Sequence, residues 1–243
     1  MVGIKLTARE VIYRLGQPAW LASQTLRYVR EAAAQVSPSH FASLFRKVRP
    51  LTMCSYARLQ SLHRAVLYIE QNKIPGDIVE CGVAHGGSAA LMALSLPDHA
   101  RKLWMFDTFQ GLPEPTPENP DHPIASAYAG AFSASPEEVK SSLRKLGIDA
   151  RTIVIVPGLF EDTLPGCGVE SIALLHVDGD WYESVRATLH HLYSRVSPGG
   201  IIQFDDYGHW AGARRAIDEF MKAQGITQPL RRIDFSGRQL IKA

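Results

Sequence analysis

Three aspartates directly follow two short apolar runs of this 243-residue chain. Asp178 comes after the run 172–177, and Asp205 and Asp206 come after the run 201–204. If the two runs are adjacent parallel strands, their carboxyl ends meet at one edge of the sheet, where three carboxylates repel one another unless a cation neutralises them. Ligands that are all oxygen favour Mg²⁺ over zinc. The spacing therefore predicts a Mg²⁺ site, and the alternative is a solvated acidic rim.

Two earlier apolar runs also end in residues that suit a ligand. Gly82 and Gly86 follow the first run and precede a helix that begins near Ser88, so a ligand can approach the backbone there. Neither a GxGxxG fingerprint nor a P-loop is present, and the carboxylate of Glu80 favours a cationic ligand. Asp107 ends the second run, where an acidic residue is placed to accept hydrogen bonds from ribose hydroxyls. Together these residues predict a site for a cationic nucleoside. The alternatives are a tight turn without a ligand and an aspartate that caps a turn.

Strand-like and helix-like segments alternate from residue 77 onward. The predicted strands are 77–81, 102–107, 152–156, 172–177 and 201–204, and the predicted helices are 88–96, 136–146, 182–195 and 209–223. Such alternation predicts an α/β fold with a doubly wound, mostly parallel sheet and helices on both of its faces. Two final runs, 230–235 and 239–242, predict an antiparallel hairpin at the sheet edge.

The first part of the chain is predicted to be helical. Residues 8–48 have the pattern of helices broken near Pro18 and Ser37-Pro38, and a further helix covers 56–72. We therefore divide the chain into a helical cap or oligomerisation region, residues 1–73, and a cofactor-binding domain, residues 74–243.

A proline-rich segment interrupts the alternation of strands and helices. Residues 109–133 contain five prolines, the first at Pro113 and the last at Pro123. Irregular connections of this length are uncommon in compact domains and usually form lids or binding loops. We predict a lid over the site, and a passive loop is the alternative.

The composition excludes several classes of protein. A hydrophobic fraction of 46% is too high for a disordered chain, and no run of about 18 apolar residues predicts a membrane span. Cys54, Cys81 and Cys167 form no CxxC pair, which predicts a reducing compartment and a cytoplasmic protein. Residues 1–50 carry eight basic and two acidic side chains, whereas the remainder carries 18 basic and 22 acidic ones. We interpret the basic segment as a solvated or partner-facing surface rather than a polyanion-binding arm.

Four segments resemble the TylF/MycF family of macrocin and mycinamicin sugar O-methyltransferases, which are class I S-adenosylmethionine-dependent methyltransferases. They are IPGDIVECGVAHGGSA, FDTFQGLPEP, HVDGDWYESV and SPGGIIQFDDY, and the resemblance covers roughly residues 50–222. The spacing of Glu80, Asp107, Asp178 and Asp205-Asp206 is also similar to that of metal-dependent O-methyltransferases of the catechol type. The resemblance implies a Rossmann-like, seven-stranded sheet with an antiparallel C-terminal hairpin and an N-terminal helical cap.

The resemblance also implies roles for individual residues. The cofactor residues would be Thr52, Glu80, Gly82, Ala84, His85, Gly86, Ser88, Asp107, Thr108, Gly158, Phe160 and Asp178. Within this set, the turn 82–88 would hold the methionine part of S-adenosylmethionine, Asp107 the ribose, and Gly158 and Phe160 the adenine. Asp178, Asp205 and Asp206 would bind Mg²⁺, and Asp178 is also a candidate general base.

The chain departs from the methyltransferase pattern at two positions. Ala84 stands where many methyltransferases have a glycine, and Trp181 stands where catechol-type enzymes have a lysine base. A lysine base at this position is therefore excluded. Deprotonation falls to Asp178, to a histidine such as His209, or to hydroxide from solvent.

These observations predict a Mg²⁺-dependent S-adenosylmethionine O-methyltransferase. Mg²⁺ acidifies a hydroxyl, and two hydroxyls on adjacent carbons can chelate the ion, so the expected acceptor is a small molecule with a vicinal diol. The family resemblance points to a sugar in a secondary metabolite, and a catechol-like acceptor is the alternative. No nucleic acid or membrane partner is expected. The apolar stripes of the N-terminal helices are compatible with a homodimer or higher homo-oligomer, and the oligomeric state stays open at this point.

Two other function classes stay open at this point. Asp178-Gly179-Asp180 after an apolar strand also matches the DxD site of a metal-dependent nucleotide-sugar glycosyltransferase. The chain could instead be a non-catalytic, methyltransferase-like binding module. Asp180 itself is either a fourth member of the acidic cluster or a cap of the following helix.

Overall fold

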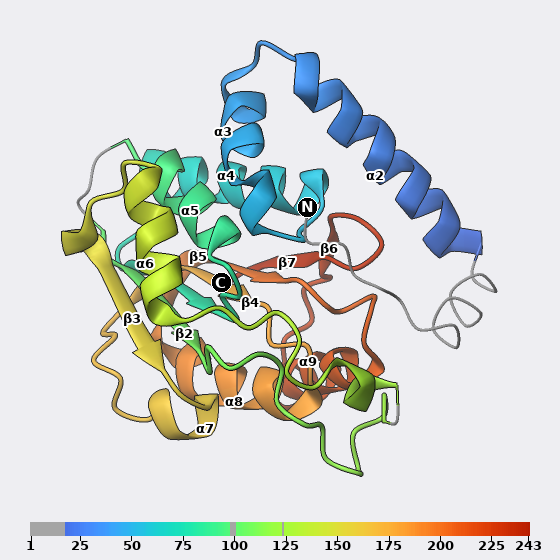
Figure 1. Ribbon diagram of the computed structural model, residues 1–243. Coiled ribbons are helices and arrows are strands. Elements are labelled where there is room, and N and C mark those ends of the chain that lie inside the picture. Colours follow the sequence, from blue (N-terminus) through green and yellow to red (C-terminus); the bar gives the residue numbers. More distant parts are fainter. Residues whose placement is uncertain (1–17, 98–100, 123) are drawn as a thin grey trace.

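The computed structural model describes residues 18–97, 101–122 and 124–243, and its centre is a seven-stranded sheet (Figure 1). The strands are β1 (Asp77–Cys81), β2 (Leu103–Asp107), β3 (Ile153–Pro157), β4 (Ile172–Val177), β5 (Val196–Phe204), β6 (Arg231–Arg232) and β7 (Arg238–Ile241). Their spatial order is β3-β2-β1-β4-β5-β7-β6. Strands β1 to β5 are parallel, and β7 pairs antiparallel with both β5 and β6. This arrangement confirms the predicted fold class, including the C-terminal hairpin.

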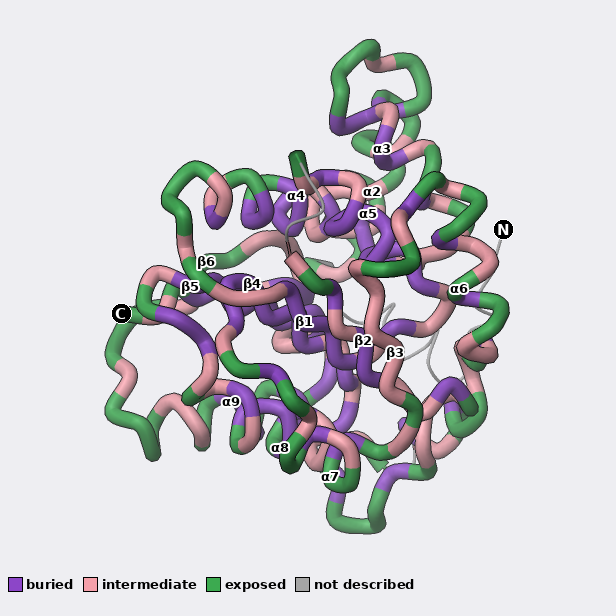
Figure 2. The backbone as a smooth tube through the Cα atoms, turned by 90° about the vertical axis from the view of Figure 1, so that its left-hand side faces the viewer, coloured by how far each residue is buried: buried purple, intermediate pink, exposed green. Residues whose placement is uncertain are grey.

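Helices cover both faces of the sheet. They are α2 (Pro18–Val36), α3 (His40–Val48), α4 (Tyr56–Gln71), α5 (Gly87–Ser95), α6 (Pro136–Lys145), α7 (Phe160–Thr163), α8 (Tyr182–Leu192) and α9 (Ala211–Ala223). Helices α3 to α6 share a buried cluster with Ile78 of β1, and α7 to α9 share the other cluster with Val79. Successive side chains of a strand point to opposite faces, so the central strands are buried on both sides. Figure 2 shows this burial for β1 and β4, which explains their apolar runs.

Two strands, β5 and β6, differ from the sequence predictions by more than one residue. β5 begins at Val196, earlier than the predicted start at 201, because its first residue pairs with Ile172 before an irregularity in the register. The predicted strand 230–235 is only Arg231–Arg232 long. It ends early because Asp234 accepts hydrogen bonds from the backbone of the next turn, which redirects the chain toward β7.

The N-terminal helices differ in how they meet the sheet. Helices α3 and α4 contribute Phe45 and Leu59, which are fully buried in the same cluster as Ile78 of β1. Helix α2 projects from the body of the molecule (Figure 1), and its Tyr28 and Val29 are 69% and 60% exposed. We retain the division of the chain after residue 73 as a proposal.

The predicted break between the first helices is present in the structure. Ser39 caps α3 by accepting a hydrogen bond from the Ala42 N–H at 3.2 Å. The predicted helical residues 8–17 lie outside the described part of the chain. In the described part, no helix combines the length and the apolar character that crossing a membrane requires.

Candidate functional site

A cleft of about 1260 Å³ opens at the carboxyl ends of the parallel strands. The predicted site residues that line it are Thr52, Gly82, Ala84, His85, Ser88, Asp107, Thr108, Phe160, Asp178, Asp205 and Asp206. Glu80, Gly86 and Gly158 do not line it. In open α/β sheets this edge is where ligands bind. The structure therefore brings together most of the residues that the sequence singled out.

The turn after β1 depends on close approaches of one chain segment to another. A Cβ atom on Gly82 would lie 1.8 Å from the carbonyl oxygen of Asp178, and one on Gly87 would lie 2.6 Å from the Thr52 side chain. Gly82 also has φ +96°, which favours glycine. These glycines thus let β1 lie against the end of β4, and α5 against the segment before α4. The sequence alone could not distinguish such packing from contact with a ligand.

Asp107 holds this turn in place from the end of β2. One carboxylate oxygen accepts hydrogen bonds from the Val83 and Ala84 N–H groups, at 2.6 and 3.0 Å. The other accepts from the Phe109 N–H at 2.8 Å. Ala84 has a left-handed backbone with φ +45°, so the turn is strained and benefits from these bonds. Asp107 both lines the cleft and fixes the shape of its wall.

Glu80 lies beneath the floor of the cleft rather than in its wall. Its side chain is fully buried, and Oε1 lies 2.9 Å from Nδ1 of His176, the neighbouring residue on β4. Its Oε2 has no hydrogen-bond partner among the described residues. The sequence predicts that Glu80 lies near the positive charge of a ligand. In the structure, its carboxylate pairs with His176.

The predicted metal residues fall into two overlapping groups. Asp178, Asp180 and Asp206 each offer a carboxylate oxygen, and these atoms lie within 4.8 Å of one another. Asp205 belongs with Asp178 to a second group. Burial, followed by repulsion from neighbouring aspartates, raises the pKa of Asp178 and of Asp180 well above the usual range. Burial also raises the pKa of Asp206. The cluster therefore favours the binding of cations.

Arg58 of α4 contacts this cluster from the side of the C-terminal hairpin. Its guanidinium pairs with Asp205, and its Nε lies 3.4 Å from Oδ2 of Asp234. Burial would lower the pKa of the guanidinium, but Asp234, the Cys54 thiol and Asp178 outweigh this effect and raise it. Arg58 therefore stays charged, and it ties α4 to the end of β5 and to the hairpin turn.

The proline-rich segment forms one wall of the cleft. It contains a short 3₁₀ helix, η2 (Ala125–Tyr128), and its Leu112 and Phe132 line the cleft. Trp181, which is 1% exposed, donates a hydrogen bond from Nε1 to the carbonyl oxygen of Pro113 at 2.8 Å. The segment is thus anchored to the loop after β4. Its action as a lid stays a proposal.

Asp121 of the same segment caps helix α9. Its carboxylate oxygens accept hydrogen bonds from the N–H groups of Ala211 and Gly212, at 3.0 and 2.7 Å. Because these groups have no partner within the helix, we expect Asp121→Ala to lower the free energy of unfolding by about 1 kcal/mol. Urea unfolding measures this loss, with the exposed Glu118→Ala as the control. Equal free energies for the two variants would contradict the capping role.

A buried indole occupies the position of the catechol-type lysine base. Trp181 packs edge to face against Trp210 with ring centroids 5.0 Å apart, and Trp210 donates from Nε1 to Asp180 at 2.8 Å. These residues support the wall of the cleft and the acidic cluster. Asp178 and His209 both line the cleft, so both remain candidates for the base.

Helix α2 forms the side of the cleft opposite the sheet. Trp20 and Gln24 line the cleft. Arg27 pairs with Glu31 and donates from Nη2 to the carbonyl oxygen of Met53 at 3.0 Å. Helix α2 is thereby attached to the segment that precedes α4, and the N-terminal region contributes directly to the site.

The residues around the acidic cluster that were not predicted as site residues include Cys54, Arg58, His176 and Asp234. A histidine inside an otherwise apolar, buried strand requires a partner, and this rule could have indicated His176. Arg58 lies in an amphipathic helix and Asp234 in a turn, without a local motif. Only the fold brings these two residues to the acidic cluster.

Comparisons with known proteins agree with this geometry. The sequence profile of the family described as macrocin-O-methyltransferase (TylF) matches residues 34–240. The 8-demethyl-8-(2,3-dimethoxy-alpha-L-rhamnosyl)-tetracenomycin-C 4'-O-methyltransferase of Streptomyces olivaceus is 34% identical over 194 residues, which are 76% of this chain and 73% of that enzyme. The mycinamicin III 3''-O-methyltransferase of Micromonospora griseorubida is 33% identical over 198 residues, 76% of each chain.

Solved structures show the same fold. The O-methyltransferase NovP has a TM-score of 0.75 and 32% identity, over 79% of this chain and 82% of NovP. The calicheamicin methyltransferase CalS11 has a TM-score of 0.66 and 23% identity, over 90% and 92% of the two chains. The chain therefore belongs to the macrocin O-methyltransferase (TylF) family, and it is an O-methyltransferase with the class I methyltransferase fold.

Proposed function

We propose that this O-methyltransferase uses S-adenosylmethionine and Mg²⁺ to methylate a sugar hydroxyl of a secondary metabolite such as an antibiotic. The relatives support the acceptor class: one is named for a rhamnosyl-tetracenomycin and another for mycinamicin III. The observation that carries the proposal is that the turn fixed by Asp107 and the carboxylates of Asp178, Asp205 and Asp206 line one cleft.

The half of the cleft next to β1 and β2 suits S-adenosylmethionine. Its wall consists of the turn from Gly82 to Ser88, Asp107 and Thr108 at the end of β2, Thr52 above α5, and Phe160 at the start of α7. The cofactor supplies a methyl group on a sulfonium centre. The protein's own part is to hold the sulfonium methyl group in line with the acceptor hydroxyl. Because the two reactants are already aligned when bound, the displacement itself avoids most of the entropic cost of bringing them together.

Removal of the Asp107 carboxylate is expected to weaken cofactor binding. In Asp107→Ala, the ribose hydroxyls lose the carboxylate that is predicted to accept their hydrogen bonds. The Val83 and Ala84 N–H groups lose the carboxylate oxygen to which they donate. We expect the affinity for S-adenosylhomocysteine to fall by roughly 1–3 kcal/mol. Isothermal titration measures the dissociation constant, and the exposed Asp162→Ala serves as the control. An unchanged constant in Asp107→Ala would show that the ribose is held elsewhere.

The acidic cluster fits a hard divalent ion. Its donors are carboxylate oxygens, the type of ligand that Mg²⁺ prefers, and burial raises the pKa of Asp178 and of Asp206. We propose Asp178, Asp205 and Asp206 as the ligands, with Asp180 beside them. When bound, Mg²⁺ supplies Lewis acidity that makes a nearby hydroxyl easier to deprotonate.

Asp178 is our proposed acceptor of the hydroxyl proton. It lines the cleft, and a carboxylate within reach of the bound acceptor can take up the hydroxyl proton. Asp180 is less suited because the Trp210 indole already donates to its Oδ1 at 2.8 Å. His209 stays the second candidate.

The size of the cleft supports a bulky acceptor. Its volume of about 1260 Å³ exceeds the roughly 300–1,000 Å³ that a pocket for one small molecule occupies. We therefore propose that cofactor and acceptor lie in it together, the acceptor being a glycoside with two hydroxyls on adjacent carbons. A cytoplasmic location and a homo-oligomeric state remain part of the proposal.

Titration with two classes of ligand tests the proposal against a glycosyltransferase. We expect S-adenosylhomocysteine to bind with micromolar affinity and UDP-sugars to give no heat of binding. Binding of a UDP-sugar without binding of S-adenosylhomocysteine would contradict the assignment of the cleft. Cofactor binding without methyl transfer to any glycoside would instead indicate a non-catalytic module.

A further inference from the structure

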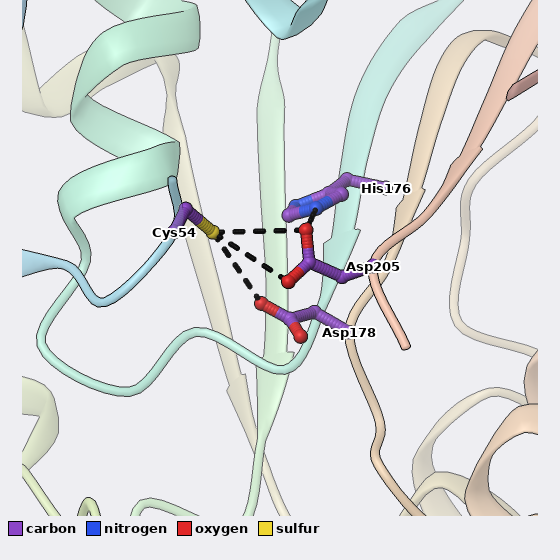
Figure 3. Close-up of side chains that lie close together, drawn as sticks. All are labelled: Cys54, His176, Asp178 and Asp205. Carbon is purple, nitrogen blue, oxygen red and sulfur yellow. Dashed lines mark hydrogen bonds and ion pairs between the residues drawn. The ribbon is translucent and has the colours of Figure 1, made fainter. Parts of the chain in front are cut away.

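Four side chains with sulfur, nitrogen and oxygen donors meet at the floor of the cleft (Figure 3). They are Cys54 from the segment before α4, His176 of β4, Asp178 after β4 and Asp205 after β5, and one donor atom of each lies within 4.8 Å of the others. The Cys54 Sγ is 3.7 and 3.8 Å from the two Asp205 oxygens and 4.0 Å from Asp178 Oδ2. The His176 Nε2 is 3.5 Å from Asp205 Oδ1.

The distances from the Cys54 sulfur and the His176 nitrogen to Asp205 are close to the distances between ligand atoms in a tetrahedral metal site. With metal–ligand bonds of about 2.0–2.3 Å, tetrahedral ligand atoms lie about 3.3–3.5 Å apart. The Cys54 sulfur and the His176 nitrogen are 3.7 and 3.5 Å from the same Asp205 oxygen, Oδ1. Both distances to Asp205 are therefore within a few tenths of an ångström of the tetrahedral values. Arg58 contacts the other oxygen of Asp205, Oδ2, and leaves Oδ1 facing the cysteine and the histidine.

The histidine is already oriented for coordination. Its Nδ1 lies 2.9 Å from Glu80 Oε1, and both side chains are fully buried. Glu80 accepts from Nδ1, which leaves Nε2, the ring nitrogen nearest to Asp205, as the atom that would coordinate an ion. A carboxylate behind a histidine is the usual second layer of a metal site, where it fixes the tautomer and the ring orientation.

We propose that Cys54, His176 and Asp205, with Asp178 as a fourth donor, bind a borderline divalent ion of the Zn²⁺ or Co²⁺ type. Thiolate and imidazole ligands select such ions, whereas Mg²⁺ takes oxygen ligands. The Cys54 thiol releases its proton to the buffer when the sulfur coordinates. Asp178 and Asp205 belong to this set and to the proposed Mg²⁺ set, so the two ions exclude each other. A borderline ion at this site would therefore inhibit methyl transfer. The mutual exclusion of the two ions and this inhibition rest on the proposed function.

The unliganded thiol has little reactivity of its own. Burial, and then the charge of Asp178, raises the pKa of Cys54 to about 12, so the sulfur stays protonated. A protonated, buried thiol is a poor nucleophile and a poor target for oxidation.

Cobalt spectroscopy of the full chain tests the site. We expect Co²⁺, added to protein stripped with EDTA and then desalted, to give a near-ultraviolet thiolate-to-cobalt band and intense visible bands of a four-coordinate ion. Cys54→Ser should lose the thiolate band, whereas Cys167→Ser, at a cysteine outside the site, should keep it. Glu80→Gln should weaken the Co²⁺ affinity by about 10–100-fold and keep the band.

Two results would overturn the inference. The first is a wild-type spectrum with only the weak bands of a six-coordinate, all-oxygen ion, and this result does not depend on the folding of any variant. The second is a thiolate band that survives in Cys54→Ser. Since the spectra need neither S-adenosylmethionine nor an acceptor, they stand apart from the methyl-transfer proposal. If the protein transfers methyl groups with Mg²⁺ but gives no thiolate band with Co²⁺, the cysteine-containing metal site is rejected and the proposed function stands.

Discussion

Asp178→Asn is expected to abolish Mg²⁺-dependent methyl transfer while the protein still binds S-adenosylhomocysteine. The change keeps the size of the side chain and removes the charge that serves both as a proposed metal ligand and as the proposed base. Loss of a general base alone costs about 10²–10⁴-fold in rate, and the loss of a metal ligand adds to this. The backbone bond from the Asp178 N–H to the Cys81 carbonyl, at 2.8 Å, is retained, so the turn should keep its shape.

The measurement for this variant has two parts. Turnover is followed with labelled S-adenosylmethionine at saturating Mg²⁺, and cofactor affinity is followed by isothermal titration. The exposed Asp162→Asn provides the matched control because it makes the same chemical change outside the cleft. A rate for Asp178→Asn within a few-fold of the wild type would remove this residue from both proposed roles.

Arg58→Met is expected to destabilise the protein by about 3–5 kcal/mol, the usual effect of removing one partner of a buried ion pair. The Arg58 side chain is 13% exposed, and the side chain of its ion-pair partner Asp205 is 4% exposed. Methionine fills much of the volume but leaves Asp205 and Asp234 without their cation. The carboxylates then repel one another in a part of the protein that water reaches poorly. Urea unfolding in the presence of EDTA measures this loss.

Mg²⁺ distinguishes a role at the metal cluster from a general packing role. Arg101→Met is the matched control, because Arg101 is 15% exposed and pairs with Glu70 away from the cleft. We expect added Mg²⁺ to restore part of the stability lost in Arg58→Met, since an ion that binds only the folded state stabilises it. In Arg101→Met, whose acidic cluster is intact, Mg²⁺ should stabilise the protein only as much as it stabilises the wild type, so the loss relative to the wild type should stay unchanged. Equal responses of the two variants to Mg²⁺ would contradict the account.

The sheet was predictable because its strands carry their signal locally. Runs such as Ile172–Val177 are buried throughout and apolar apart from His176, as expected of strands buried on both faces, and helices separate them. The ends of β5 and β6 were not predictable in the same way. The start of β5 depends on an irregular register with β4, and the end of β6 depends on hydrogen bonds to Asp234. Both are tertiary effects with no local pattern.

The site was predictable where a side chain with a functional group lies at the end of a strand. Asp107, Asp178 and Asp205 each follow an apolar run, so the parallel topology alone brings them to one edge. The pairing of Glu80 with His176 was not predictable, because a residue inside a strand end points either to the cleft or beneath it; its role toward the cofactor stays a prediction. The contact of Arg58 with Asp205 joins residues 147 positions apart, and only the packed structure reveals it.

The most direct test of the central claim is transfer of a labelled methyl group to a glycoside, followed by mass spectrometry. The purified chain is incubated with labelled S-adenosylmethionine and a panel of glycosides with vicinal diols, alongside analogues that lack one of the two hydroxyls. We predict a singly methylated product from at least one diol with Mg²⁺, none with EDTA, and recovery when Mg²⁺ is returned. Undiminished product in EDTA, or equal methylation of the analogue that lacks the neighbouring hydroxyl, would contradict the account.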